Sequence, residues 1–295
     1  MFESVLFPVT LRESRAQFLS AAVFLHRMGA REFFICHVLD TGFGKEAVMQ
    51  KKAQAYRVLI EDNLQDATAH ADVLTGHAGT EIITHAERMK ATYIFIPAGR
   101  KRWLGKILVG STAADVVRLT TLPVFVHKKK PVIHPDIQLV NQFGGGTEED
   151  EYVGHIDNKR ENAAKLFELA IAAIDFGATT ERTTEIVSHV SLYCPSVLFF
   201  HVGKRSGDPY REAERKKAVK NKLTELKESF YSQCHTEIKD VIGLPSREII
   251  RETKRSGADL VIMGKSNEKT PGEMLLGSTA ERVLNNSETS LIVTP

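Results

Sequence analysis

The chain has 295 residues, of which 42% are hydrophobic and 26% are charged. Its 39 Lys and Arg residues stand against 37 Asp and Glu residues, so the formal net charge is only +2. Such a balance gives no strong field for nucleic acid, and we expect no nucleic-acid partner. Most single domains contain about 100–150 residues, so a chain of this length predicts two domains.

Three cysteines, Cys36, Cys194 and Cys234, are too few and too scattered for a disulfide framework or a four-ligand zinc site. This usage is typical of a reducing compartment, and we expect a cytoplasmic protein. The first residues lead directly into an apolar strand, without the features of a signal peptide. Because no apolar stretch approaches the roughly 20 residues that span a bilayer, we also expect no direct membrane insertion.

The first part of the chain alternates β-rich runs with stretches of helical periodicity. The runs are residues 4–9, 33–39, 93–96 and 124–126. After the first run, Phe18, Ala22 and Leu25 fall on one helical face, which predicts a helix that faces the core. Strands that alternate with helices indicate a parallel sheet covered on both faces.

A change of composition follows. The basic triplet 128–130 is expected to be the solvated end of a strand, with an anion contact as the weaker alternative. Three glycines at 144–146 and an acidic run at 148–151 indicate an exposed connection. We therefore predict domains at residues 1–130 and 165–295, joined by a linker at 131–164.

The second domain repeats the pattern of the first. Its β-rich runs are residues 169–174, 197–202, 260–263 and 291–293, and Ile186, Val190 and Tyr193 share one helical face. The segment LVGSTA at 108–113 recurs as LLGSTA at 275–280, an offset of 277 − 110 = 167. Gly76 and Gly243 keep the same offset, since 243 − 76 = 167. The sequence therefore predicts a tandem duplication of a doubly wound α/β domain.

A glycine-punctuated loop follows the last long strand of the second copy. Gly264, Asn267 and Gly277 are separated by two and nine residues, and Ser278 and Thr279 then open a helix. Glycine lets the backbone approach an anion, and a helix N-terminus favours negative charge. A Ser278–Glu281 capping box and ordinary turn glycines explain the same residues, and these alternatives stay open.

Two other nucleotide-binding motifs are incomplete. The spacing around 272–279 and around 105–112 approaches that of a P-loop, but the lysine is absent from both copies. No G-x-G-x-x-G follows either first strand. We therefore expect neither a P-loop NTPase nor a dinucleotide-binding Rossmann domain.

The spacing G-x2-N-x9-G-S that starts at Gly264 resembles the ATP-binding signature G-x2-G-x9-G-[ST] of universal stress proteins, with Asn267 at the second glycine. Asp175 at a strand end, His201-Val202, and VIGLP at 241–245 are similar to the family's strand-end acid, H-V and V-x-G-x-P. The resemblance covers both copies and omits only the linker.

This resemblance implies two tandem Rossmann-like domains of the adenine nucleotide alpha hydrolase type, with mainly parallel five-stranded sheets. It implies ATP or AMP as the ligand, with Mg²⁺ as an optional companion. The residues that it assigns to the nucleotide are Ala173, Ile174, Asp175, Val202, Met263, Gly264, Asn267, Gly277, Ser278 and Thr279.

The first copy departs from the signature. Thr10 replaces the acid, Arg102 replaces the second glycine, and the loop is two residues shorter, because 110 − 99 = 11 whereas 277 − 264 = 13. We expect this copy to be mainly architectural. His37 and His201 are expected to be structural, and Asp175 either ligates Mg²⁺ or caps a turn.

The preferred hypothesis is a cytoplasmic stress-response regulator that binds ATP or AMP in its C-terminal domain and alters a surface for a protein partner. A nucleotide-independent scaffold is the alternative, and a slow ATPase is weaker because no catalytic arrangement is readable. We expect an intramolecular pseudo-dimer, joined through residues 124–126 and 291–293, with a homodimer as a further option.

Overall fold

The computed structural model describes residues 2–40, 44–98, 102–103, 106–107, 109–128, 137–140, 153–156, 166–205, 207–230, 234–265 and 276–295. The chain divides into two compact units. Unit 1 contains Met1–Ile96 and Lys130–Ala164, and unit 2 contains Pro97–Lys129 and Lys165–Pro295. The end of the first copy thus belongs to the same unit as the second copy.

Unit 1 contains parallel strands in the order β4-β1-β2-β3. Its elements are β1 (Ser4–Pro8), α1 (Arg15–Arg27), β2 (Glu32–Leu39), α2 (Glu46–Asn63), β3 (Thr68–Thr75), α3 (Ala78–Arg88) and β4 (Tyr93–Pro97). Helix α1 buries Phe18, Ala22 and Leu25, so the predicted core face is confirmed.

The predicted linker contains secondary structure that the sequence did not indicate. Strands β8 (Ile137–Val140) and β9 (Val153–Ile156) pair in an antiparallel hairpin, with Ile137 opposite Ile156. Each strand has only four residues, which is too short for a clear alternation of polar and apolar side chains.

Unit 2 is built on the sheet β12-β11-β10-β13-β14-β7. Its elements are β5 (Arg102–Trp103), β6 (Lys106–Ile107), α4 (Ser111–Leu119), β7 (Val124–His127), β10 (Ala170–Ala173), α5 (Thr180–Val190), the 3-10 turn η1 (Ser191–Tyr193), β11 (Ser196–Gly203), α6 (Pro209–Ser229), β12 (His235–Ile242), α7 (Pro245–Ser256), β13 (Leu260–Gly264), α8 (Ser278–Asn286) and β14 (Ser290–Thr294).

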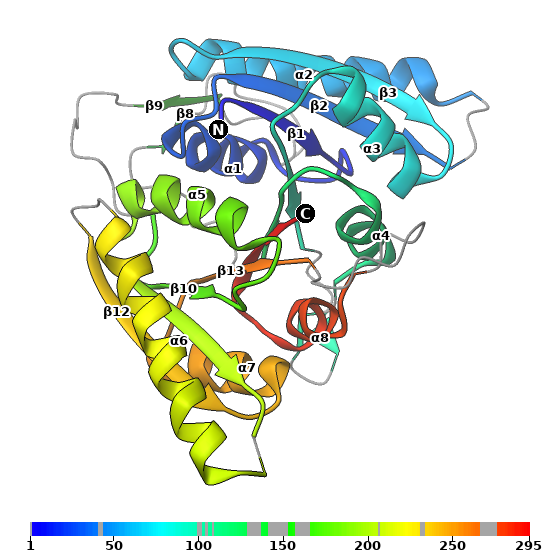
Figure 1. Cartoon of the computed structure of the whole chain (residues 1–295). Helices are drawn as coiled ribbons and strands as arrows, with labels where there is room; N and C mark the ends of the chain where they lie inside the picture. Colours follow the sequence, from blue (N-terminus) through cyan, green and yellow to red (C-terminus); the bar gives the residue numbers. More distant parts are fainter. Residues whose placement is uncertain are drawn as a thin grey trace. The chain divides into compact units, whose positions relative to one another are not determined.

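Helices cover both faces of this sheet. Helices α5 and α6 lie along one face, and α7 and α8 along the other (Figure 1). The strands run parallel from β12 to β14, and the chain order reverses beside β10, which has β11 on one side and β13 on the other. Ligands of doubly wound sheets bind at such a switch point, beyond the carboxyl ends of the strands.

The last strands of the two copies pair as the sequence predicted. Strand β7 lies antiparallel to β14, with Phe125 opposite Ile292 and Val124 opposite Val293. All of these side chains are buried. Pairing covers strand edges that would otherwise expose unpaired backbone groups, and it explains why segment 97–129 groups with the second copy.

The basic triplet requires a correction. Lys128 is only 4% exposed, and its Nζ donates hydrogen bonds to the carbonyl of Leu284 and, at 2.7 Å, to that of Ser287. The prediction of a solvated strand end is therefore wrong for Lys128, because its side chain caps the end of α8. Lys129 and Lys130 lie outside the described residues.

Strands β3 and β12 were not predicted. They form edges of their sheets, and their sequences, such as HTEIKDVI in β12, mix charged and apolar residues. An edge strand is only partly buried, so its hydrophobic signal is weak. Across the described segments, every helix is too short or too polar to cross a membrane.

Candidate functional site

The predicted residues of the first and fourth parallel strands of the second copy meet at the switch point. Ala173 at the end of β10 is in register with Met263 of β13 and with Phe200 of β11. The amide of Ile174 donates to the Phe200 carbonyl at 2.9 Å. Ile174 and Met263 are buried. These residues, about 90 positions apart in sequence, form an apolar floor at the carboxyl edge of the sheet.

Asp175 leaves this floor and is exposed. Its Oδ1 accepts a hydrogen bond of 2.9 Å from the amide of Gly177, so the carboxylate caps the turn that leads to α5. Phe176 between them has a φ of 56°, in the left-handed region that side chains other than Gly, Asn and Asp rarely adopt. Among the described residues, no group of three or more acidic, His or Cys side chains could hold a metal.

Gly264 faces the start of α5, at the end of β13. A Cβ at position 264 would overlap Oγ1 of Thr179 and lie 2.7 Å from its Cβ. Thr179 is the N-cap residue of α5 and is itself buried. The absence of a side chain at 264 therefore lets α5 approach β13, a role that sequence spacing does not reveal.

The N-terminus of α8 stands next to the same strand. Gly277 is the N-cap, and its amide donates to the Lys265 carbonyl at 2.8 Å. Ser278 is the first helical residue and is exposed, and no side chain of the described residues caps the helix. The capping-box alternative is thus wrong, because Ser278 lies one position too late to cap. The first-turn amides of α8 have no acceptor within the helix.

Two further predicted residues lie in β11 and at the start of α8. Val202 is half-buried in β11, two positions beyond the residue that pairs with Ala173. Thr279 is half-buried in the first turn of α8. Asn267 lies outside the described residues, as do all of 266–275.

His201 lies among polar and aromatic side chains of neighbouring elements. Its Nδ1 lies 2.8 Å from Oδ1 of Asp240 on β12, and Arg215 of α6 donates to the other oxygen of that carboxylate at 3.2 Å. The His201 ring also contacts the Phe176 ring, with centroids 5.5 Å apart. The Lys222 ammonium lies 5.4 Å from the Phe176 centroid. Sequence reasoning missed Phe176 and Lys222, because their contacts come from different elements.

The first copy has a different arrangement at the matching positions. Thr10 donates to Oε1 of Glu13 through both its amide, at 3.0 Å, and its hydroxyl, at 2.7 Å. His37 Nδ1 lies 2.9 Å from the Val9 carbonyl, which agrees with a structural role. In unit 2, part of the shorter loop forms the two-stranded hairpin β5–β6.

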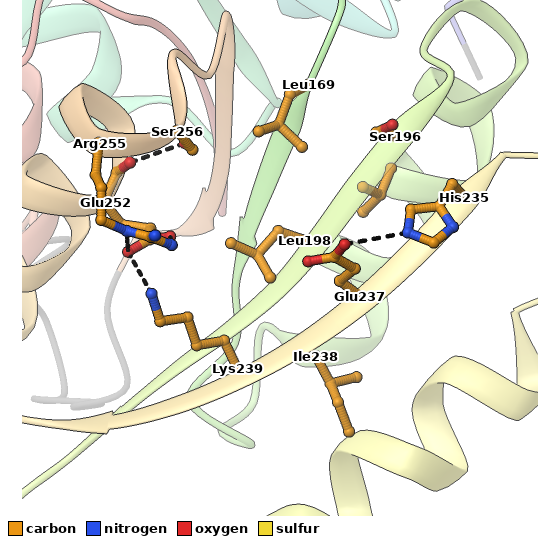
Figure 2. Close-up of a pocket in the computed structure, with 11 residues that line it drawn as sticks. Leu169, Ser196, Leu198, His235, Glu237, Ile238, Lys239, Glu252, Arg255 and Ser256 are labelled. Carbon is orange, nitrogen blue, oxygen red and sulfur yellow. Dashed lines mark hydrogen bonds and ion pairs between the residues drawn. The ribbon is translucent and has the colours of Figure 1, made fainter.

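A cavity of about 290 Å³ lies at the opposite edge of the unit 2 sheet, between β12 and α7. Figure 2 shows two leucines, Leu169 and Leu198, between two groups of hydrogen-bonded polar side chains. Glu252 accepts from Lys239 at 2.7 Å and from Arg255, and these bonds hold its pKa below the ordinary value. Because ligands of such sheets bind at the carboxyl edge, this amino-edge cavity is separate from the predicted site.

Fold and site together define a tandem protein of doubly wound α/β type with a glycine-bordered helix N-terminus at the switch point of its second copy. A model of the universal stress protein family matches residues 1–128 and 156–295. The chain belongs to this family, with one match in each copy.

Three similar proteins illustrate the relationship. Universal stress protein MJ0577 of Methanocaldococcus jannaschii is 32% identical over 84 residues, which are 25% of this chain and about half (52%) of that protein's length. A universal stress protein of Archaeoglobus fulgidus matches 99% of this chain and 97% of its own, with a TM-score of 0.61 and 19% identity. The protein PA1789 of Pseudomonas aeruginosa matches 99% and 92%, with a TM-score of 0.65 and 15% identity. The two structures share the fold.

Proposed function

We propose that this protein is a cytoplasmic stress-response regulator that binds an adenine nucleotide, ATP or AMP, in its second copy. The observation that carries the proposal is the approach of the α8 N-terminus to the end of β13, through the 2.8 Å bond between the Gly277 amide and the Lys265 carbonyl. It supports an anion position beside the apolar floor of Ala173, Ile174 and Met263. The domain division at 1–130, 131–164 and 165–295 is part of the proposal.

Most of the predicted residues would have a role in this arrangement. The floor and Val202 would contact the adenosine, and the amides at the start of α8, with the hydroxyls of Ser278 and Thr279, would receive phosphate oxygens. The free oxygen of Asp175, which is exposed, is a candidate ligand for an accompanying Mg²⁺. The bound nucleotide would contact the chain around Gly277 and change a surface to which a protein partner binds.

Titration of the purified protein with ATP and with AMP, followed by calorimetry, tests the proposal. We expect saturable binding below millimolar concentration and a loss of at least about tenfold in affinity for Gly277→Val, since a bulky side chain would obstruct the helix N-terminus. Gly110→Val is the matched control, because Gly110 caps the equivalent helix α4 and has open space around its α-carbon.

Other results would contradict the proposal. If the protein does not bind nucleotide, or if the wild type and Gly277→Val bind it equally well, the nucleotide-independent scaffold is favoured. Steady release of inorganic phosphate that stops in Asp175→Ala would indicate an ATPase instead of a regulator. An association of the two copies as a pseudo-dimer is supported by the β7–β14 pairing and agrees with either outcome.

A further inference from the structure

Lys265 has an unusual set of contacts for a residue beside a loop. It follows Gly264 directly and is only 7% exposed. Its amide donates to the Thr294 carbonyl at the end of β14, at 2.7 Å. Its carbonyl accepts from the Gly277 amide, and its Nζ donates to the Thr120 carbonyl at 3.0 Å. Its three polar groups thus reach three different elements.

The contact with Thr120 joins the two copies. Thr120 is the C-cap residue of α4, in the segment of the first copy that belongs to unit 2. Carbonyls at a helix C-terminus lack partners within the helix and carry the negative end of its dipole, so an ammonium group there is favourable. Thr120 is only 1% exposed, so its carbonyl accepts this hydrogen bond in a buried environment.

The end of α4 leads directly into the strand that joins the copies. The amide of Leu122 donates to Oγ1 of Thr120 at 3.1 Å, and β7 starts two residues later. A displacement of Thr120 would therefore reach the β7–β14 pairing.

We propose that Lys265 is a positioning residue that couples the α8 N-terminus of the second copy to the end of α4 in the first. A ligand that shifts Gly277 acts on the Lys265 carbonyl, and the buried ammonium transfers that shift to Thr120. Thermodynamic coupling is reciprocal, so if ligand binding stabilises the contact at Thr120, the intact contact raises the affinity for the ligand by the same factor. The ligand part of this inference rests on the proposed function, whereas the structural coupling does not.

Lys128 provides a matched control within the same unit. It too is a buried lysine that donates to carbonyls at a helix C-terminus, but that terminus belongs to α8, and it does not contact Gly277 through the backbone. Burial lowers the pKa of both lysines to about 8. Lys265→Met and Lys128→Met therefore remove comparable groups at different places.

Amide hydrogen exchange of the full chain without nucleotide tests the coupling. We expect Lys265→Met to accelerate exchange at Gly277 and Thr120 by roughly tenfold or more, because both amides lie beside the lost anchor. Lys128→Met should instead accelerate exchange at Ser287, whose amide bonds to Val283 in the last turn of α8. An unchanged Gly277 in Lys265→Met, or an equal change in both variants, would overturn the proposal.

A second arm adds ATP as the probe. In the wild type, ATP should slow exchange at Thr120, and Lys265→Met should abolish that protection and weaken affinity about three- to tenfold, whereas Lys128→Met should preserve both. Binding without protection at Thr120 would refute the coupling. Failure of the wild type to bind ATP would refute the proposed function, and the nucleotide-free arm would still decide the role of Lys265. If Lys265→Met does not fold, Lys265→Gln, which keeps a donor but no charge, should show faster exchange at Gly277 than the wild type, and exchange equal to wild type would count against the proposal.

Discussion

Gly264 ends β13 with the side chain of Thr179 against its α-carbon. In the family signature this glycine belongs to a phosphate loop, but in the structure its immediate neighbour is a helix N-cap. A residue of the proposed site is thus also constrained by packing. Asp175 is constrained by a hydrogen bond, since its carboxylate caps a turn through one oxygen, and it is still exposed.

Gly264→Ala should destabilise the protein by about 1–3 kcal/mol, because the new methyl group overlaps Thr179 in a packed region. Urea unfolding measures this difference. Thr179→Gly should restore most of the loss in the double variant, since the side chain of Thr179 makes no capping hydrogen bond.

Gly110→Ala is the control for the backbone effect of the substitution, because a Cβ at position 110 would meet nothing within 4 Å. It should leave stability within about 0.5 kcal/mol of the wild type. Equal losses for Gly264→Ala and Gly110→Ala would show that contact with Thr179 is not the cause.

The two ends of helix α8 are capped differently. Among the described residues no side chain caps its N-terminus, whereas its C-terminus receives the ammonium of Lys128 from the other copy. The amides of the first turn have no acceptor within the helix, so an anion bound there would accept from them. Helix α4 repeats this arrangement, with a glycine N-cap and Lys265 at its end.

The buried cap of α8 predicts a pH dependence. In the folded protein burial lowers the pKa of Lys128 to about 8, while an unfolded chain keeps a lysine near about 10.4. Between these values the unfolded state binds more protons, so the free energy of unfolding rises with pH, and no such gain occurs below about 8. The contribution is at most roughly 3 kcal/mol.

Urea unfolding of the wild type and of Lys128→Met from about pH 7.5 to about pH 10 checks this. The stability of the wild type relative to the variant should increase across the window, because Lys265 and the other groups that titrate there are common to both proteins and only Lys128 is missing from the variant. A difference that stays constant, or falls, would mean that the ammonium of Lys128 is not disfavoured by burial.

At the scale of the whole molecule, the duplication has become structurally unequal. The segment 97–129 of the first copy belongs to the compact unit of the second, where β7 pairs with β14. Backbone pairing and the two lysine caps therefore connect the copies independently of the linker.

A protease site introduced in place of residues 144–146 tests this connection. After cleavage, the two fragments should elute together in size-exclusion chromatography, because β7 and β14 remain paired with buried side chains such as Phe125 and Ile292. The uncut protein is the control. Separation of the fragments under native conditions would show that the linker, and not the pairing, holds the copies together.

The sequence alone predicted the duplication and most of the strands of this protein. The offset of 167 residues predicted the duplication, and the apolar runs predicted the eight central strands and the β7–β14 pairing. These features are local or repeated, so they can be recognised from hydrophobic periodicity and from repeated segments in the sequence. The edge strands β3 and β12 were missed because a half-exposed edge has no strong periodicity.

Only the tertiary structure decided what the individual polar residues do. Lys128 was predicted to be solvated and Gly264 to be a loop glycine, and each has a different role because of neighbours distant in sequence. Burial and hydrogen-bond partners depend on which elements pack together, and sequence spacing carries no record of that packing. The sequence therefore determined where the central strands lie, and the packing of the two copies decided the contacts of the residues that border the glycine loop, such as Lys265 and Gly277.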